Sequence, residues 1–268
     1  MTGVTRSARG REQLERVGAR AVEADVFDEA SLRRAFDGAD AVVNLLTHVP
    51  SADRMADPSS WEENDRVRTE ASAAIARAAE AARVQRLVQE SIAFVYADGG
   101  DAWLDEDAPV AGGGVTTTAL TAERNARELF DADTVVLRFG LFMGPDSGST
   151  RAALEAARGG ASIAVGPPGA YRPTLWLDDA AAAIAAALRA PAGTYNVADT
   201  DPATNAEIDA ALAAAVGLSA LQPRAPQDGP LARSQRVSNR QLREVSGWAP
   251  RVRAATETWG RIADRIAA

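Results

Sequence analysis

Hydrophobic and polar positions alternate between strand and helix patterns along the first half of the chain. Short apolar runs predict buried strands at residues 20–26 (RAVEADV), 39–46 (ADAVVNLL), 86–96 and 134–139 (TVVLRF), after a first short β-prone run at residues 2–6. Helical spacing predicts helices at residues 11–17, 28–36, 60–82 and 117–130. Uninterrupted apolar strands joined by helices are typical of a parallel sheet covered on both faces. We therefore expect a doubly wound, Rossmann-like α/β fold.

The alternation of strand and helix patterns becomes less regular after residue 140. Helices are expected at residues 149–158, 178–188, 204–216, 238–245 and 254–266, and strands at residues 162–165 and 193–197. The helix at 204–216 begins with the Thr-x-x-Glu pattern of a capping box, from Thr204 to Glu207. We expect a core at residues 1–140 and a smaller C-terminal α+β lobe at residues 141–268, with residues 178–197 returning to the core.

Composition excludes several kinds of chemistry. The formal net charge is −8, so nucleic acid and anionic membranes are poor partners. The chain has no cysteine and one histidine, His48, which excludes thiolate catalysis, disulfides and a multi-histidine metal site, and we expect no metal. All 29 basic residues are arginine, so no mechanism that needs a lysine amine can operate. No signal peptide or membrane span is evident, and we expect a cytoplasmic protein.

Five features in the expected order give the chain its resemblance to a known family. They are the βαβα rhythm and the segments 90–96 (ESIAFVY), 137–145 (LRFGLFMGP), 172–180 (RPTLWLDDA) and 193–197 (GTYNV). These segments resemble the "S-S-x-x-V-Y-G", "L-R-x-x-N-x-Y-G-P", "R-x-F-x-H-V-x-D-x-A" and "G-x-x-Y-N-V/I" segments of the NAD(P)-dependent epimerase/dehydratase family. The resemblance implies an extended short-chain dehydrogenase/reductase that binds NAD(P) and acts on a small molecule.

The chain departs from this family at its start. Family members open with a strand, a G-x-x-G-x-x-G turn and a helix whose N-terminal amides hold the cofactor pyrophosphate. The first residues here match the family's second strand, so we expect the first strand and the glycine-rich loop to be missing. A GTG codon is read as methionine only at initiation, so Met1 is expected to be an internal valine position read as a start, or the gene to be truncated. Roughly 30 residues of a βαβ unit would then lie upstream.

The second departure is catalytic. The family's Tyr-x-x-x-Lys pair lies on the helix after the fifth strand, where this chain places Leu120 and Arg124. Leucine cannot transfer a proton, and arginine keeps a fixed charge. The family's Ser/Thr partner falls on Ile92, with Ser91 one residue away and so on the opposite face of the strand. The usual apparatus for proton transfer is therefore expected to be absent.

Candidate cofactor residues lie at the ends of the predicted strands, where ligands bind in open α/β sheets. By resemblance, Arg6 accommodates the 2′-phosphate of NADP, and Asp25 and Val26 contact the adenine. The remaining candidates are Asn44, Leu45, Leu46, Thr47, Arg124, Phe139 and Gly140. Because no acidic residue stands at the position of Arg6, we expect NADP to be preferred over NAD. For several of these residues the alternative is an ordinary surface or strand-end role.

Candidate catalytic residues are Ser91, His48 and Tyr96, each as a substitute for the missing pair. His48 is a candidate acid/base by its residue type but is also typical of a surface loop, and Tyr96 matches a tyrosine that usually packs structurally. Phe142, Met143 and Arg172 are candidate substrate contacts, since Arg172 matches an arginine that contacts nucleotide-sugar phosphates in relatives. Glu123 and Arg124 are expected to be an exposed charge pair.

Three functions stay open. The chain is an atypical epimerase, dehydratase or reductase for a small molecule, a non-catalytic cofactor-sensing or scaffold protein, or an inactive truncated product. In relatives the helices at 60–82 and 117–131 form a dimer interface, so a homodimer is possible.

Overall fold

The computed structural model describes residues 1–51, 54–55, 57–225 and 228–267. Its centre is a four-stranded parallel sheet in the order β10-β6-β4-β3, formed by β3 (Ala41–Asn44), β4 (Arg86–Ile92), β6 (Asp133–Phe139) and β10 (Gly193–Val197). Leu87 and Val88 of β4 pair with Thr134 and Val135 of β6, and all three pairings are parallel. The doubly wound α/β fold predicted from the apolar runs is confirmed.

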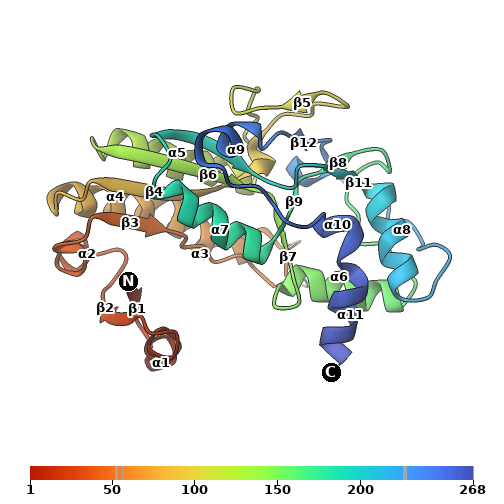
Figure 1. The fold of residues 1–268 in the computed structure, drawn as a ribbon, viewed down its shortest axis with the longest axis horizontal. Coiled ribbons are helices and arrows are strands. Elements are labelled where there is room, and N and C mark those ends of the chain that lie inside the picture. Colours follow the sequence, from red (N-terminus) through yellow and green to blue (C-terminus); the bar gives the residue numbers. More distant parts are fainter. Residues whose placement is uncertain (52–53, 56, 226–227, 268) are drawn as a thin grey trace.

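Two further parallel strands form a sheet of their own. β1 (Thr2–Thr5) pairs with β2 (Arg20–Glu23), and α1 (Ala8–Arg16) connects them. In the described part of the chain no ladder joins β1 to β3, so the central sheet is in two pieces, and β1, β2 and α1 lie apart from the four strands in Figure 1. β1 and β3 therefore each have one edge that pairs with no other strand of the described residues. The expectation of an additional upstream strand stays a prediction.

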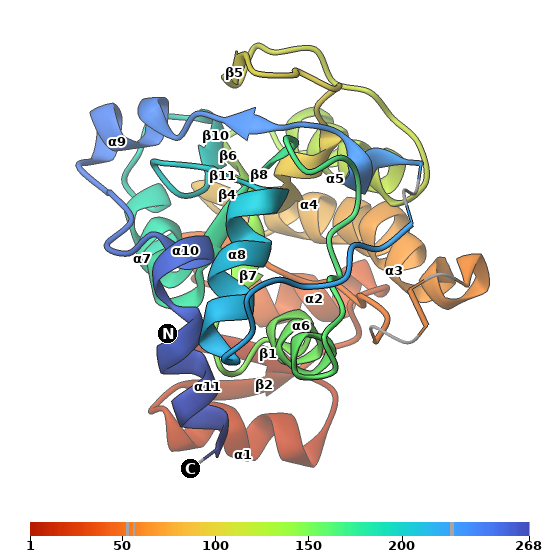
Figure 2. The same ribbon diagram turned by 90° about the vertical axis from the view of Figure 1, so that its right-hand side faces the viewer.

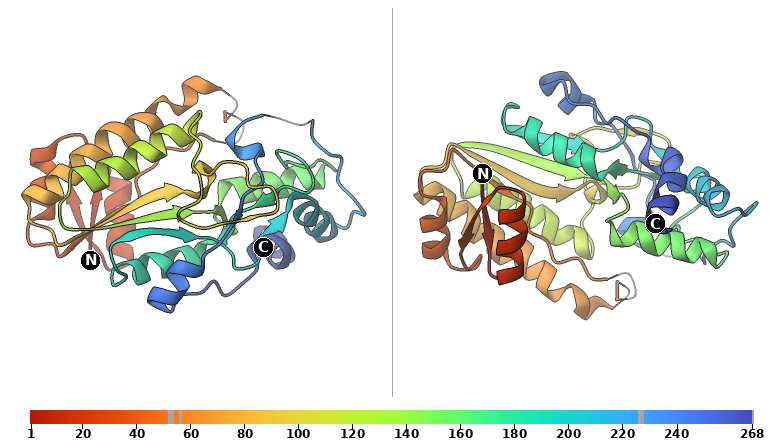
Figure 3. Two further views of the ribbon diagram at one scale, coloured as in Figure 1. Left: turned by 90° about the horizontal axis from the view of Figure 1, so that it is seen from above. Right: turned by 60° about the horizontal axis from the view of Figure 1, so that its bottom comes forward.

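Helices cover both faces of the four-stranded sheet, as the view from above shows (Figure 3, left). On one face α2 (Glu29–Phe36), α4 (Ser72–Ala81) and α5 (Val115–Glu128) pack into a core around Leu87. On the other face α7 (Leu177–Ala187) and α9 (Arg240–Ser246) pack against Val88, Leu137 and Val197. Alternate residues of β4 thus enter different cores, as the two-residue period of a strand requires.

The predicted helix at 60–82 is interrupted. A 3-10 turn, η1 (Pro58–Trp61), leads into α3 (Glu62–Arg66), a π-helical turn, η2 (Val67–Ala71), and then α4. π turns are rare and often occur at functional sites. Arg68 lies on this turn and contacts Glu90 of β4 at 2.7 Å, with both side chains buried.

The second lobe gathers four helices at one end of the molecule (Figure 1, right). α6 (Gly148–Arg158), α8 (Asn205–Ala215), α10 (Ala254–Glu257) and α11 (Trp259–Ala267) pack around Leu154, Leu212 and Ile262. The capping box predicted at Thr204 and Glu207 is confirmed, with both reciprocal hydrogen bonds present. Short strands complete the fold: β5 (Trp103–Leu104), β7 (Leu141–Met143), β8 (Tyr171–Arg172), β9 (Thr174–Trp176), β11 (Ala203–Thr204) and β12 (Arg236–Val237).

Two strand predictions were wrong in part. The strand predicted at 86–96 ends at Ile92, because Ala93–Val95 form a 3-10 turn, η3, that leaves the sheet. Residues 162–165 are not a strand, since their neighbour Ala161 forms only an isolated bridge with Gln222. β4 stops where its partner β6 ends, at the Ile92–Phe139 pair, and residues 162–165 pair with no strand among the described residues.

Asp199 is the buried acid that joins the second lobe to the core. It follows β10, is 2% exposed, and accepts hydrogen bonds from Thr174 Oγ1 at 2.8 Å and from the amide of Ala254 at 2.9 Å. Its Oδ1 atom is buried without a partner. Burial raises the pKa of Asp199 to about 7, against the opposing hydrogen bonds.

We expect this acid to make the free energy of unfolding depend on pH. A raised folded-state pKa means that the stabilising contribution is complete below the unfolded-state pKa and is lost as pH rises through about 7. Asp199→Asn should therefore flatten the fall in stability between pH 4 and pH 7, which amounts to at most about 4 kcal/mol. Urea titrations across this range test it, with Asp201→Asn as control, because Asp201 forms an exposed pair with Arg253. Equal slopes in wild type and Asp199→Asn would contradict the prediction.

Candidate cofactor pocket and active site

A pocket of about 250 Å³ lies where the carboxyl ends of β1, β2 and β3 meet. It brings together five of the residues predicted from the sequence: Arg6, Val26, Leu46, Thr47 and His48. The other lining residues are Val4, Thr5, Ala24, Phe27, Glu63 and Val67. The two pieces of the sheet therefore contribute to one pocket, which is lined by both apolar and polar side chains and includes the charged residues Arg6 and Glu63.

Two other predicted residues shape this pocket through the backbone. The Asp25 carboxylate accepts a hydrogen bond from the amide of Phe27 at 3.0 Å and so holds the turn after β2. Asn44 is buried, donates to Gln89 Oε1 at 2.8 Å and accepts from the amide of Leu46 at 3.1 Å. Asn64 of α3 accepts from the amide of His48 at 3.1 Å. The segment after β3 is thus fixed at both ends by side chains.

A buried ion pair occupies the carboxyl end of β4 and β6. Arg138 of β6 donates to both carboxylate oxygens of Glu123 on α5, each at 2.9 Å. Ser91 of β4 donates to the same carboxylate at 2.6 Å, and Arg127 adds a contact at 3.1 Å. Arg138 also donates to the Tyr96 hydroxyl at 2.9 Å. The expectation that Glu123 is exposed was wrong: it is 1% exposed, because its helix face packs on the sheet.

The charges in this network are set by its own contacts. Burial by itself raises the pKa of Glu123, but the hydrogen bonds and charge of Arg138, together with Ser91, outweigh burial and lower it below the ordinary value. Burial raises the pKa of Tyr96 to about 12, although Arg138 opposes the change. Glu123 is therefore a fixed anion and Tyr96 a fixed neutral phenol at physiological pH.

The face of α5 that meets the sheet carries no proton donor of the expected type. Its buried residues are Thr116, Ala119, Ala122, Glu123 and Ala126. Arg124 is exposed on the outer side, and Leu120 is half-buried. Ser91, the strand residue next to the expected Ser/Thr position, is fully buried and engaged with Glu123.

The predicted catalytic residues do not converge. Tyr96 is fully buried and donates to Asn196 Oδ1 at 2.7 Å, which directs its hydroxyl toward β10. His48 is exposed and lines the pocket at the strand ends together with Arg6. Ser91 lies between them in the sequence but faces α5. Ser91 and Tyr96 therefore both belong to the Glu123–Arg138 network, whereas His48 lies apart from it at the pocket.

The predicted substrate residues divide in the same way. Arg172 of β8 is 8% exposed, lies over the Phe94 ring at 5.3 Å and donates to the Leu231 carbonyl, and no acidic side chain of the described residues forms an ion pair with it. Burial lowers the pKa of Arg172 to about 10. Phe142 is partly exposed and contacts Phe139, whose ring is buried. Met143 lies inside the second-lobe core.

Packing explains the glycine at position 140. A side chain at this position would meet the backbone of Pro173 at 2.8 Å, where the amide of Leu141 donates to the Pro173 carbonyl. Glycine therefore allows the segment after β6 to cross the segment before β9.

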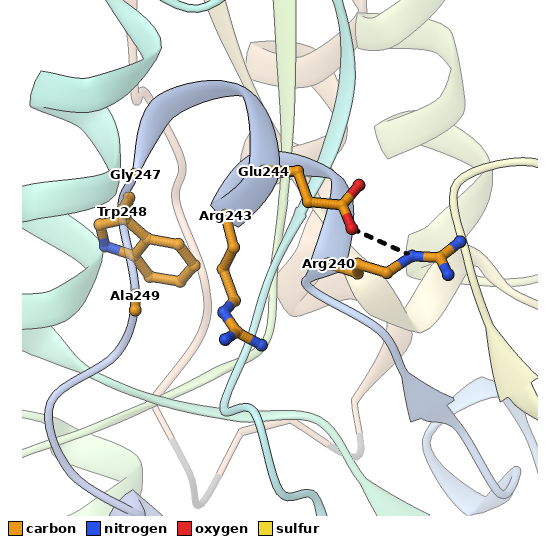
Figure 4. Close-up of a pocket in the computed structure, with 6 residues that line it drawn as sticks. All are labelled: Arg240, Arg243, Glu244, Gly247, Trp248 and Ala249. Carbon is orange, nitrogen blue, oxygen red and sulfur yellow. Dashed lines mark ion pairs between the residues drawn. The ribbon is translucent and has the colours of Figure 1, made fainter.

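A second pocket, of about 420 Å³, lies on α9 and contains none of the predicted residues. Figure 4 shows Arg243 beside the Trp248 ring and an ion pair between Arg240 and Glu244 at 4.0 Å. Although it is larger, we assign the candidate site to the pocket at the strand ends, where the polar groups of several elements converge. Over the part of the chain that the structure describes, no cluster of three or more potential metal ligands occurs, and no helix is both long and apolar enough to cross a membrane.

Sequence reasoning missed the residues that lie across the fold from the predicted ones. Phe27, Glu63 and Val67 line the pocket, but they come from the turn after β2, from α3 and from the π turn. Arg138 was visible only as part of a sequence segment, and its partner Glu123 lies 15 residues earlier. The signal available for this pairing was an acidic residue on the helix face that also carries Ala119 and Ala126.

The sequence is similar to known proteins. A family model described as NAD(P)H-binding matches residues 1–165. A 3-diazoavenalumate denitrifying reductase from a Streptomyces species is 35% identical over 199 residues, which cover 70% of this chain. The match spans 65% of the length of that reductase.

Solved structures share the fold. The Bordetella bronchiseptica enzyme WbmG, in complex with NAD and UDP, superposes with a TM-score of 0.77 at 22% identity, over 98% of this chain and 86% of its own. The human epimerase family protein SDR39U1, with NADPH, superposes with a TM-score of 0.76 at 22% identity, over 95% of this chain and 94% of its own.

The buried ion pair should be essential for stability. Glu123→Gln removes the carboxylate and leaves the Arg138 guanidinium buried without a counter-charge, so we expect the free energy of unfolding to fall by about 3–5 kcal/mol. Chemical denaturation of the variant measures this. Glu128→Gln on the exposed side of the same helix is the control and should change stability by no more than about 0.5 kcal/mol. A comparable small effect in both variants would show that the pair is not essential.

Proposed function

Because the chain belongs to the NAD(P)H-binding family, we propose that it is a reductase that transfers a hydride from NADPH to a small electrophilic molecule without a proton from the protein. The observation that supports this is the Glu123–Arg138 pair, which occupies the carboxyl end of β4 and β6, together with the lack of any lysine. Tyr96, the buried tyrosine of this region, keeps its proton because its pKa is raised to about 12.

The residues present fit the adenosine end of the cofactor. The pocket at the strand ends is lined by apolar side chains and by Arg6, and the first turn of α1, which begins at Ala8, contains no acidic residue. A guanidinium and helix N-terminal amides suit a phosphate group. Leu45, Leu141 and Phe142 are partly exposed apolar side chains after β3 and β6, and they offer a surface for the nicotinamide ring. When bound, the reduced cofactor supplies a hydride.

The chain's own residues then restrict which acceptors can react. A carbonyl that takes up a hydride becomes an alkoxide and needs a proton, which general acids normally donate for a gain of about 10²–10⁴-fold in rate. A cationic acceptor that loses a neutral leaving group needs none. An aryl diazonium ion is such an acceptor: the hydride forms the C–H bond, the C–N bond breaks, and its electron pair leaves with N₂.

The diazo acceptor is suggested by the related reductase, whose name gives 3-diazoavenalumate as the compound and denitrification as the outcome. The ending of the compound name indicates that the molecule carries a carboxylate. Arg172 is buried over Phe94 and has no acidic partner among the residues that the structure describes, and we propose it for an anionic group of the substrate. The substrate would lie between the carboxyl edge of the sheet and the second lobe, residues 141–268.

A non-catalytic, cofactor-sensing protein is the second candidate. Leu120 and Arg124 at the positions of the usual acid/base pair favour it, because without that pair a bound cofactor stays idle. Turnover of any acceptor separates the two functions. We further propose a homodimer through the helices at 60–82 and 117–131, the second of which carries Arg124 on its exposed side.

We expect turnover to be selective for acceptors that need no proton. With NADPH and an aryl diazonium carboxylate, formation of the arene should be catalysed and change little between pH 6 and pH 8. Ketones and sugar nucleotides should not reach the typical kcat of about 10 s⁻¹. Consumption of NADPH and chromatography of products measure both. Robust ketone reduction would reject the proposal, and His48→Ala and Tyr96→Phe would then identify a substitute acid.

We also expect NADPH to bind more tightly than NADH. The Arg6 guanidinium offers a charge-assisted contact to the 2′-phosphate, which NADH lacks. Arg6→Ala should weaken NADPH binding about tenfold and leave NADH binding nearly unchanged, as measured by fluorescence titration. Arg9→Ala, on the following turn and outside the pocket, is the matched control. Equal affinities for the two cofactors in the unmutated chain would contradict this preference.

A further inference from the structure

The pocket at the strand ends is built from two parts that share no strand ladder. Val4, Arg6 and Phe27 belong to the unit formed by β1, α1 and β2, here called the N-terminal unit and defined as residues 2–27. Leu46, His48 and Glu63 belong to the main body. A ligand in this pocket must therefore contact both parts at once.

A stacked contact joins the two parts beside this pocket. The Arg66 guanidinium of α3 lies over the Phe27 ring, 3.8 Å from its centroid. Glu70 holds the same arginine at 3.1 Å and Glu63 at 3.9 Å. Phe27 is itself a wall of the pocket, and so is Glu63. Glu63 and Glu70 therefore hold the Arg66 side chain in place, and Arg66 in turn holds the Phe27 ring.

We propose that Arg66 and Phe27 form a clasp that couples binding of the adenosine end of the cofactor to docking of the N-terminal unit. This inference rests on the proposed function, because it takes NADPH as the occupant of the pocket. Both residues act as positioning residues: they hold the two walls at the spacing that the ligand requires. A ligand that contacts both walls stabilises the docked arrangement, and a weaker clasp lowers its affinity by the same linkage.

The chain contains a matched control for this clasp. Arg77 of α4 forms an ion pair with Glu29 of α2, the helix that directly follows the N-terminal unit, and its side chain is 48% exposed, as is that of Arg66. Arg77 does not line the pocket, and its partner is a carboxylate rather than a pocket wall. Removal of either arginine thus deletes one exposed cationic contact to this region, but only Arg66 touches the pocket wall.

The test uses the full chain and two fragments of the cofactor as probes. Adenosine 2′,5′-bisphosphate represents the adenosine end, and nicotinamide mononucleotide represents the other end. We expect Arg66→Gln and Phe27→Leu to weaken binding of the bisphosphate by about three- to tenfold, the range of a single cation–π contact. Phe27→Tyr, which keeps the ring, and Arg77→Gln should stay within about twofold of the unmutated chain. Binding of nicotinamide mononucleotide should be the same in all variants.

Hydrogen exchange supplies a second readout that simple loss of stability would not reproduce. In the unmutated chain the bisphosphate should slow exchange of the amides of Thr2–Thr5 and Arg20–Glu23, and this protection should be smaller in Arg66→Gln. Equal effects of Arg66→Gln and Arg77→Gln, or an unchanged affinity in Arg66→Gln, would overturn the clasp while the proposed cofactor stands. If the unmutated chain binds neither fragment nor NADPH, the proposed function and the clasp both fail.

Discussion

Glu123 and Arg138 form the contact on which the carboxyl end of the sheet depends. Their two hydrogen bonds join α5 to β6, Ser91 attaches β4 to the same carboxylate, and Tyr96 links Arg138 to Asn196 of β10. A buried carboxylate is costly unless it is paired, and here β4, β6 and α5 itself supply its partners. The strands and the helix are therefore held in one relative position by a charge that none of them could bury alone.

The same constraint limits the chemistry. Leu120 stands where the family resemblance implies a proton donor, and the nearby titratable groups keep fixed protonation states, since the pKa of Glu123 is lowered and that of Tyr96 is raised. What the site offers is an apolar surface beside a cofactor pocket and a buried arginine, Arg172. Such a site suits a hydride acceptor whose positive charge makes it reactive without a proton from the protein.

The sequence was sufficient for the parts of the fold that depend on local pattern. The apolar runs predicted β3, β4, β6 and β10, and the Thr204–Glu207 capping box was confirmed, because both signals lie within a few residues. Leu46 and Thr47 were candidates by the rule that ligands bind at carboxyl ends of strands, and Arg6 and Val26 by the family resemblance; all four line one pocket, and their cofactor role stays a prediction. The burial of Glu123 and the stacking of Arg66 on Phe27 could not be predicted, since each depends on a partner that only tertiary structure supplies. The end of β4 at Ile92 was missed because the apolar run continues beyond the point where its neighbour stops.

The central claim is that the protein supplies no proton to the product, and an isotope measurement tests it most directly. Reduction of an aryl diazonium carboxylate would be run once with NADPH deuterated at the transferred position in ordinary water, and once with unlabelled NADPH in deuterium oxide. The account predicts one deuterium in the arene from the labelled cofactor and none from the solvent. Deuterium from the solvent at the reacting carbon, with none from the cofactor, would contradict it.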